Sequence, residues 1–396
     1  MVSGPERQTL PGPVRGTRPA NRRELIVLAA SDLFYRKGYT TVGMGEVAEA
    51  VAIGPSALYR HFRGKQDMLA TVVADALATV EGALGAATPA DVGTGLATAA
   101  LAHRRIGVLW RREARHLSAD NRAELRAASR RIIARLTELV RERRPASSTD
   151  EADLLARCAL AVVNSVSFHS LSLPEPGFTT LLGELVSATI DAPISLPEPT
   201  APVARAGVLS TRSRREAILT EAAKLFARKG FAGVGIEDIG AAVGIAGPSV
   251  YNHFTTKAEI LTAAVLRGDE WLRMDMNRAF AQATDPRDGL HRLLRSYRAF
   301  TFENPDLVQI LLSEAMHLPE PDRQRGRAAQ HAYIAEWVHL AVEVHPRWDP
   351  IAARIRVQAA QTLCNEIALT PHLAARSGIE APLLAIGDEL LGIADR

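Results

Sequence analysis

The sequence predicts an all-helical protein in which one unit occurs twice. Residues Arg22–Leu69 align without a gap to Arg214–Leu261, at an offset of 192, and about 20 of the 48 positions are identical. Apolar residues in both copies recur at the spacings of three and four that are typical of amphipathic helices, and no convincing stretch alternates as a β-strand does. A weaker match at an offset of 201 extends each copy to about 190 residues, far longer than one unit of a solenoid, so the chain is a tandem duplication.

Composition narrows the class of protein. With 396 residues, of which 47% are hydrophobic, the chain can form two domains or more. Its two cysteines, Cys158 and Cys364, lie far apart, which excludes a disulfide framework and the usual zinc spacings and fits a reducing cytosol. No apolar run reaches the roughly 18 residues of a membrane helix. Residues 1–20 are polar and rich in Pro and Gly, and we expect them to form a disordered basic arm of a cytoplasmic protein.

The first helix of each copy has recognisable ends. The sequences Asn-x-x-Glu at 21–24 and Ser-x-x-Glu at 213–216 have the spacing of a capping box, which begins a helix. The Lys-Gly pairs at 37–38 and 229–230 indicate its end, because a cation is favourable near a helix C-terminus and glycine readily adopts a positive φ.

Further helices follow in the same order in both copies. We expect a short helix at 44–51 or 236–243, a tight turn, a second short helix ending in Tyr-x-His-Phe at 59–62 or 251–254, and a longer amphipathic helix from Lys65 or Lys257. Five or so more helical stretches, broken by Pro and Gly, complete each copy. The Pro-rich residues 192–210 between the copies are expected to form a semi-extended linker.

Two short helices joined by a tight turn and braced by a third form a helix-turn-helix, whose second short helix fits the major groove of DNA. The pattern from the first helix through Tyr-x-His-Phe-x-x-Lys to the following leucine resembles the DNA-binding domain of the TetR family of bacterial transcriptional regulators. The resemblance covers about 48 residues in each half, and the helical remainder supports it more loosely. It implies three N-terminal helices that bind double-stranded operator DNA, followed by helices that form a ligand pocket and a four-helix dimer interface.

The resemblance and the repeat together predict six regions. They are a basic arm at 1–20, a first DNA-binding domain at 21–66, a first regulatory domain at 67–191, the linker at 192–210, a second DNA-binding domain at 211–258 and a second regulatory domain at 259–396.

The resemblance also implies which residues face DNA. Tyr59, Tyr251, Lys65 and Lys257 would contact phosphates, which fixes register without reading sequence. Arg60 has donors that suit guanine, whereas Asn252 has the donor and acceptor pair that suits adenine. The full set is Gly54, Pro55, Ser56, Ala57, Tyr59, Arg60, His61 and Lys65 in the first half, and Ala246, Gly247, Pro248, Ser249, Tyr251, Asn252, His253 and Lys257 in the second.

Both halves depart from the family pattern. Gly43 and Gly235 occupy the position where Ser or Thr often caps the second helix, and Ala52 replaces the turn glycine that the second half keeps as Gly244. Each of these residues is expected to weaken the contact with DNA of the half in which it lies. An alternative hypothesis is therefore that one half has lost DNA contact and serves as a structural, ligand-binding or partner-binding module.

The regulatory domains offer polar residues for an effector pocket. The sequences REARHLS and FHSLSLPEPG resemble a small group of actinobacterial tandem TetR-type repressors of lipid and steroid uptake, which implies a small apolar ligand, acyl- or sterol-like. Each candidate also has a simpler interpretation as a satisfied polar group in the core, and the repetition of Glu-Ala-x-His-Leu at 113–117 and 314–318 is compatible with shared packing. The candidates are Trp110, His116, Asn164, Ser167 and His169 in the first half, and His317, Asn365 and Glu366 in the second.

An enzyme is the rival class. The HExxH, P-loop, GxSxG and paired-cysteine metal motifs are not found, so we expect no catalytic residue, cofactor or metal site. Because both copies share one chain, the linker gives them a high effective concentration, and we expect an intrachain pseudo-dimer, with a higher oligomer as an alternative. Its interface is predicted to pack Ala152–Leu171 and Phe178–Thr189 on Ile351–Thr370 and Ala381–Ile393.

Overall fold

The structure is a computed structural model that describes residues 22–198 and 213–394, and within these ranges it is helical without β-strands. The first half contains α1 (Arg22–Lys37), α2 (Met44–Ala50), α3 (Pro55–Leu58), α4 (Lys65–Ala86), α5 (Val92–Ala102), α6 (Ile106–Glu113), η1 (Ala114–His116), α7 (Ala119–Arg143), α8 (Thr149–Asn164), η2 (Ser165–Ser167) and α9 (Gly177–Asp191). The basic arm expected at 1–20, Asn21 of the expected capping box and most of the linker lie outside the described residues.

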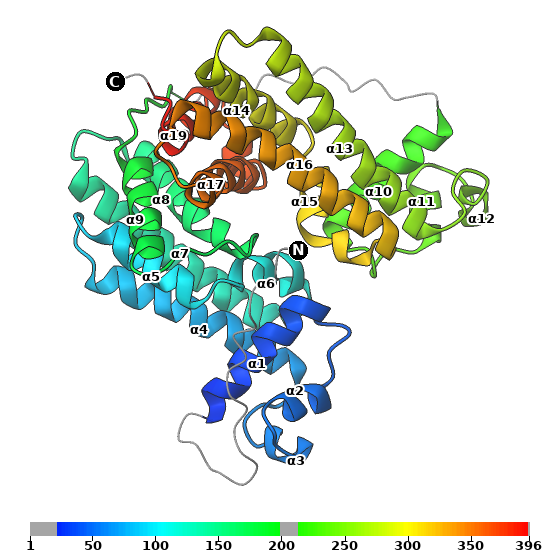
Figure 1. Ribbon diagram of the computed structural model, residues 1–396. Coiled ribbons are helices and arrows are strands. Elements are labelled where there is room, and N and C mark those ends of the chain that lie inside the picture. Colours follow the sequence, from blue (N-terminus) through cyan, green and yellow to red (C-terminus); the bar gives the residue numbers. More distant parts are fainter. Residues whose placement is uncertain (1–21, 199–212, 395–396) are drawn as a thin grey trace, which may run out of the picture.

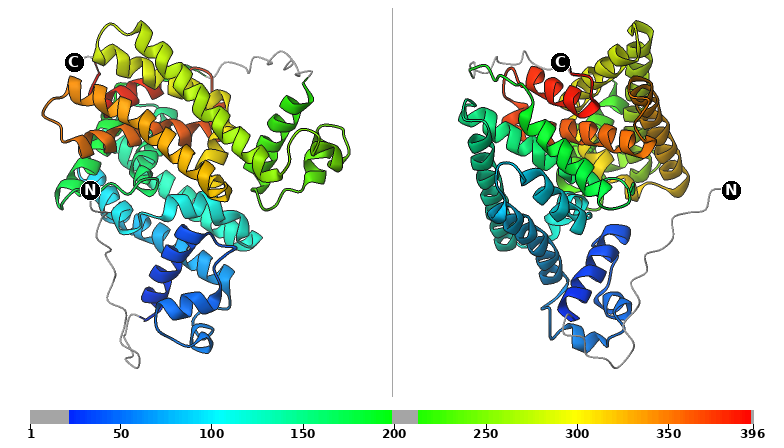
Figure 2. Two further views of the ribbon diagram at one scale, coloured as in Figure 1. Left: turned by 45° about the vertical axis from the view of Figure 1, so that its right-hand side comes forward. Right: turned by 60° about the vertical axis from the view of Figure 1, so that its left-hand side comes forward.

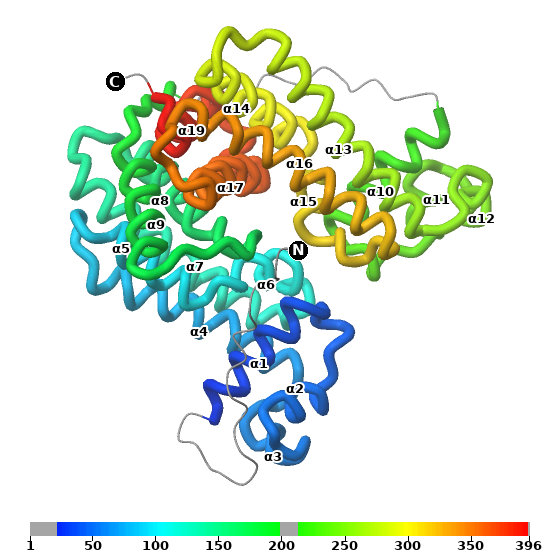
Figure 3. The backbone as a smooth tube through the Cα atoms, viewed as in Figure 1, coloured from blue at the N-terminus to red at the C-terminus, as the bar shows by residue number. Residues whose placement is uncertain are grey.

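The second half repeats this order. It contains α10 (Arg214–Lys229), α11 (Ile236–Ala242), α12 (Gly247–Val250), α13 (Lys257–Gln282), α14 (Pro286–Glu303), α15 (Pro305–Ser313), η3 (Ala315–His317), α16 (Glu320–Val344), α17 (Pro350–Ala368), α18 (Pro371–Ala374) and α19 (Glu380–Leu391). The all-helical tandem duplication predicted from the repeat is therefore confirmed. The smooth tube in Figure 3 shows the two halves following each other along the chain.

One helix cap and one helix boundary differ from the sequence-based expectation. Ser213 caps α10 by accepting a hydrogen bond from the Glu216 amide, but the Glu216 carboxylate pairs with Arg267 on α13 rather than completing a capping box. The recognition helix α3 ends at Leu58, and residues 59–62 continue as turns in which the amides of His61 and Phe62 donate to the Leu58 carbonyl. The Tyr-x-His-Phe sequence therefore lies at the C-terminal end of each recognition helix.

The long helix α4 corrects one expectation. By length and composition alone it is apolar enough to cross a membrane, although no uninterrupted apolar run suggested this. In the structure α4 packs against α1, α5 and α7, and its residues Met68, Leu69 and Val73 are buried in the protein. This placement is that of a helix within a folded domain.

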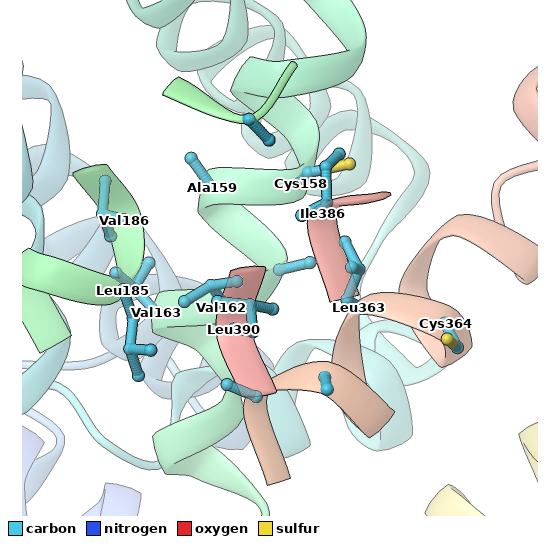
Figure 4. Close-up of a cluster of buried hydrophobic side chains, with 14 of the residues drawn as sticks. Cys158, Ala159, Val162, Val163, Leu185, Val186, Leu363, Cys364, Ile386 and Leu390 are labelled. Atoms are coloured by element: carbon cyan, nitrogen blue, oxygen red, sulfur yellow. The ribbon is translucent and has the colours of Figure 1, made fainter. Parts of the chain in front are cut away.

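The two halves meet through the helices that the repeat predicts. Helix α8 packs on α17, and α9 packs on α19, so that the four helices form one interface within the chain. Figure 4 shows Val162 of α8 near Leu363 of α17 and Leu390 of α19, all of which are fully buried. Each such side chain contributes about 1.5–3 kcal/mol when it leaves water. The cysteines Cys158 and Cys364 are free thiols in this core, and burial raises the pKa of both.

The helix-turn-helix units project from this bundle at separate places. We call residues 22–62 the first head and residues 214–254 the second head. Figures 1 and 2 show α1–α3 at one end of the molecule and α10–α12 at another, each joined to the bundle by a long helix, α4 or α13. Each head has its own small core, anchored by fully buried phenylalanines, Phe34 and Phe62 in the first and Phe226 and Phe254 in the second.

Candidate nucleic-acid interface and effector cavities

The recognition segments present polar and aromatic side chains to solvent. Tyr59 is 56% exposed and Tyr251 is 52% exposed, although large aromatic side chains are usually buried. Arg60 and Asn252, at equivalent positions one residue later, are also exposed. In the second head the guanidinium of Arg215, itself exposed, lies 4.3 Å from the centroid of the buried Phe254 ring, two residues after Asn252.

The lysine of each Tyr-x-His-Phe-x-x-Lys motif occupies a different place from the one expected. Lys65 Nζ lies 2.7 Å from the Tyr39 carbonyl oxygen and 3.0 Å from that of Val42, and it sits 4.3 Å from the Tyr39 ring centroid. Lys257 Nζ lies 2.8 Å from the carbonyl oxygens of Phe231 and Val234. Partial burial lowers the pKa of both ammonium groups. Both lysines thus tie down the loop after the first helix of each head, and the phosphate contact expected from the sequence stays a prediction.

A buried glutamate supports the same loop from the regulatory domain. Glu113, which is 3% exposed, accepts a hydrogen bond from the Tyr39 amide at 3.2 Å, and His116 stacks on the Tyr39 ring at 4.8 Å. Burial lowers the pKa of His116, so the ring favours its neutral form.

The second half repeats this support. Glu314, which is 1% exposed, accepts from the Phe231 amide at 2.9 Å, and His317 stacks on Phe231 at 5.3 Å, with its pKa likewise lowered by burial. The repeated Glu-Ala-x-His-Leu sequence therefore connects each regulatory domain to its own head.

The residue between this alanine and histidine contacts the head of the other half. Arg115 of the first half lies against Gly230, at the end of α10, where an added Cβ would be 1.6 Å from Nη1. Met316 of the second half lies against Gly38, at the end of α1, where an added Cβ would be 2.8 Å from Cε. Both glycines have positive φ, 75° and 83°, so each helix ends in a conformation that only glycine adopts readily. These two contacts, each from one half to the head of the other, are related by a pseudo-two-fold arrangement of the halves.

The contacts that Arg115 and Met316 make with the opposite heads differ chemically. Arg115 donates to the carboxylate of Glu314, whereas Met316 is apolar. In the first half Glu113 has an arginine from its own half, since Arg112 donates to it and also to the Phe34 and Tyr35 carbonyls at the end of α1. The position that matches Arg112 in the second half is Ser313. The buried carboxylate of the second half therefore takes its cation from the first half.

The turn inside the first head carries backbone strain. Ala52 has φ 53°, in the left-handed region, where the second head has Gly244 with φ 71°. An L-residue with a side chain costs about 1–2 kcal/mol in this region. Ala52, which replaces the turn glycine of the family pattern, thus keeps the turn geometry at an energetic cost.

Two cavities lie beside the heads. A cavity of about 490 Å³ in the first half is lined by parts of α1, α4 and the segments around residues 101–109 and 166–170. A larger cavity of about 1160 Å³ is built mainly by α13 to α17 of the second half. Its wall mixes apolar side chains, such as Leu272, Met276 and Phe300, with charged ones, such as Arg273, Arg325 and Glu336. A volume of this size can hold a lipid-sized molecule.

Four of the eight candidate effector residues line one or both of these cavities. Ser167 lies at both cavities, His169 at the smaller one, and His317 and Asn365 at the larger one. The Asn365 amide oxygen accepts from Tyr297 Oη at 3.0 Å. Burial lowers the pKa of His169 to about 3, and its Nε2 is buried without a partner in the structure.

The other four candidates line neither cavity. Trp110 packs on the core of the first head, and His116 supports the loop at Tyr39. Asn164 and Glu366 lie where the halves meet, with Asn164 Nδ2 at 3.5 Å from Glu366 Oε1, and Arg111 also donates to Glu366. The structure thus places these four side chains in packing or interface positions, because α6 and η1 turn Trp110 and His116 toward the first head, and α8 and α17 turn Asn164 and Glu366 toward each other.

Polar residues that the sequence reasoning missed line the larger cavity. Gln361 is 6% exposed and its Nε2 has no partner, and Asp269 Oδ2 and Arg323 Nε are buried without one. Burial raises the pKa of Asp269 to about 6. The signal available in the sequence was Gln361 itself, an amide at the position where the first half has Leu160.

Comparison with known proteins identifies the two heads. Residues 26–72 and 218–264 match the family model described as bacterial regulatory proteins, tetR family. A curated relative, the HTH-type transcriptional activator FasR of Mycolicibacterium smegmatis, is 30% identical over 79 residues, which cover 18% of this chain and 36% of that protein. The chain therefore spans about a third of the length of the curated relative that it matches.

The solved structures that the chain matches include regulators from several bacteria. PfmR, a TetR family transcriptional regulator from Thermus thermophilus, is 24% identical, with a TM-score of 0.41 over 48% of this chain and 100% of its own. The ketosteroid transcriptional regulator KstR2 of Mycobacterium tuberculosis is 22% identical, with a TM-score of 0.35 over 37% of this chain and 79% of its own.

Proposed function

The chain is a tandem TetR-family protein with two helix-turn-helix DNA-binding domains, and we propose that it is a transcriptional repressor that binds an asymmetric operator through both heads of one chain. A small apolar effector, acyl- or sterol-like, releases it from DNA. The observation that carries the proposal is the pair Arg60 and Asn252, two exposed side chains of different chemistry at equivalent positions of otherwise similar heads.

The scaffold around these two positions is the same in both heads. The exposed tyrosine precedes each of them, and the buried phenylalanine follows two residues later. A homodimer presents identical recognition segments, so its operator tends to be palindromic. Arginine favours guanine, whereas asparagine favours adenine, so the two heads of this chain are expected to select different half-sites.

The larger cavity supports the effector part of the proposal. Its wall combines apolar side chains with polar and charged ones, a mixture that suits an amphipathic small molecule. A ligand can shift the equilibrium between DNA-binding and released states only by its difference in affinity for the two. The effector is therefore expected to bind the free protein more tightly than the DNA-bound protein.

Selection of binding sequences from random DNA tests the operator prediction. We expect two unlike half-sites. Arg60→Ala should relax base preference in one half-site only, at a cost of about 1–3 kcal/mol, and Asn252→Ala should relax the other. Because Lys65 and Lys257 are engaged with backbone carbonyls, Tyr59→Phe and Tyr251→Phe are better probes of phosphate contact, and each should weaken all sequences alike.

Three results distinguish this proposal from its alternatives. A perfect palindrome, or relaxation of the same positions by Arg60→Ala and Asn252→Ala, contradicts two divergent heads. A single half-site that responds to only one of the two substitutions favours the alternative in which one half has lost DNA contact. The first head is the candidate for that loss, because Ala52 strains its turn.

A further inference from the structure

The larger cavity of the second half has part of the first head in its wall. Tyr35, Arg36 and Lys37, at the end of α1, and Thr41, in the loop that follows, all line it. Among the described residues that form this cavity, none lies in 213–264, the range that contains the second head. A molecule inside the cavity would therefore contact the head of the other half directly, and it would reach its own head through α13 and through His317, which stacks on Phe231.

The interior of the cavity lacks hydrogen-bond partners. The Gln361 amide nitrogen, the second carboxyl oxygen of Asp269 and the Arg323 Nε are buried and unpartnered in the structure. A buried polar group without a partner costs about 1–3 kcal/mol. These three atoms are closed off from the cavity space as well as from water, so the polar group of an amphipathic ligand, such as a hydroxyl or a carboxylic acid, would reach one of them only after a lining side chain moves.

Two wall residues connect the cavity to the first head. Arg112 lines the cavity and donates to the Phe34 and Tyr35 carbonyls, the last turn of α1. Met316 also lines it and lies against Gly38, the residue at which α1 ends. Any movement of these side chains to admit a ligand changes what holds the end of α1.

Among the described residues of the first half, we find no equivalent large cavity with the head of the other half in its wall. Its α5 is pressed against α9, where a Cβ added to Gly93 would lie 2.5 Å from the Gly183 carbonyl oxygen. The corresponding helix of the second half, α14, carries Tyr297 and Phe300 at the large cavity. The duplication has thus left the two regulatory domains with different internal spaces.

We propose that an amphipathic, lipid-sized effector occupies the α13–α17 cavity and acts in trans, releasing the first head through Met316 and Arg112. This inference rests on the proposed function and adds which half binds the effector and which head responds. In allosteric terms, the coupling free energy links the second regulatory domain to the first head.

The test uses the full-length chain, a selected operator and parinaric acid, a fluorescent fatty acid, as the probe. Fluorescence titration measures its affinity, and footprinting at saturating probe measures the occupancy of each half-site. We expect binding of the probe to weaken occupancy of the Arg60 half-site by about tenfold. Gln361→Leu and Ala329→Trp should weaken probe binding, the first by removing a buried donor and the second by filling the cavity.

Met316→Ala should reduce the response of the Arg60 half-site at saturating probe to about twofold or less, because it removes the contact with Gly38. The matched variant is Arg115→Ala, at the equivalent position of the first half, which should leave the response of the Arg60 half-site at its wild-type size.

Release of the Asn252 half-site alone overturns the trans proposal while leaving the proposed function intact. Probe binding that is insensitive to both Gln361→Leu and Ala329→Trp, or no probe binding at all, overturns the assignment of the cavity and ligand class. Failure to select any DNA sequence contradicts the proposed function itself, and this result is obtained before the probe is added.

Discussion

The ion pair between Arg115 and Glu314 gives a prediction that isolates the contact between the halves. Arg115→Ala removes a charged donor from a carboxylate that is 1% exposed. Loss of one partner of a buried ion pair costs about 3–5 kcal/mol. Glu314 retains the Phe231 amide and the Ser313 hydroxyl, both at 2.9 Å, and Arg115 is partly exposed, so we expect about 2 kcal/mol.

Hydrogen exchange can locate this loss. The Phe231 amide donates to Glu314 in the second head, and the Tyr39 amide donates to Glu113 in the first. A loss of about 2 kcal/mol corresponds to roughly 30-fold faster exchange. We expect this at Phe231 in Arg115→Ala, with the Tyr39 amide unchanged, and a smaller effect in Arg115→Lys. Equal acceleration at both amides, or none at either, refutes the reasoning that Arg115 specifically supports the second head.

Two further predictions concern strain in the first head and burial in the cavity. Ala52→Gly should slow hydrogen exchange of the Ile53 amide about fivefold, and Gly244→Ala should speed exchange of the Ile245 amide by the same factor, because a left-handed alanine costs roughly 1 kcal/mol more than glycine. The effect at Gly244 reports strain alone, since no other atom lies within 4 Å of the added Cβ. An unchanged exchange rate at both amides contradicts the strain argument. Burial raises the pKa of Asp269 to about 6 from 3.8, so the native state loses stability as pH rises through that window. Asp269→Asn should therefore stabilise the protein at pH 8 by about 1–2 kcal/mol, a value already reduced for solvent screening. Urea unfolding should show that this gain in the free energy of unfolding vanishes near pH 4. An equal gain at pH 8 and pH 4 contradicts the argument from burial of Asp269.

The sequence predicts the fold well because its signals are local. Apolar spacing, the Lys-Gly helix ends and the 192-residue offset together predict the heads and the long helices that begin at Lys65 and Lys257, and the structure confirms these helices. The four-helix packing between the halves followed from the duplication, since equivalent faces of two copies can pair.

The site was harder to predict, because it depends on distant contacts. The ammonium of Lys65 turns inward to carbonyls 23 and 26 residues earlier in the chain, which a motif cannot reveal. Glu366 pairs with Arg111 across 255 residues, and the cavity wall at Tyr35 comes from the other half. The repeat of Glu-Ala-x-His-Leu was visible, but its contact with the loop of each head depends on how the regulatory domain folds back.

The interface formed by α8, α9, α17 and α19 has a consequence for gene dosage. In a homodimer, dilution separates the subunits, and DNA binding then falls with the square of chain concentration. In this chain both sides of the interface belong to one molecule, so dilution does not separate them. A cell with only a few copies of the protein would therefore retain every copy in a form with both heads, and, if one chain occupies one operator as proposed, operator occupancy would fall in simple proportion to copy number.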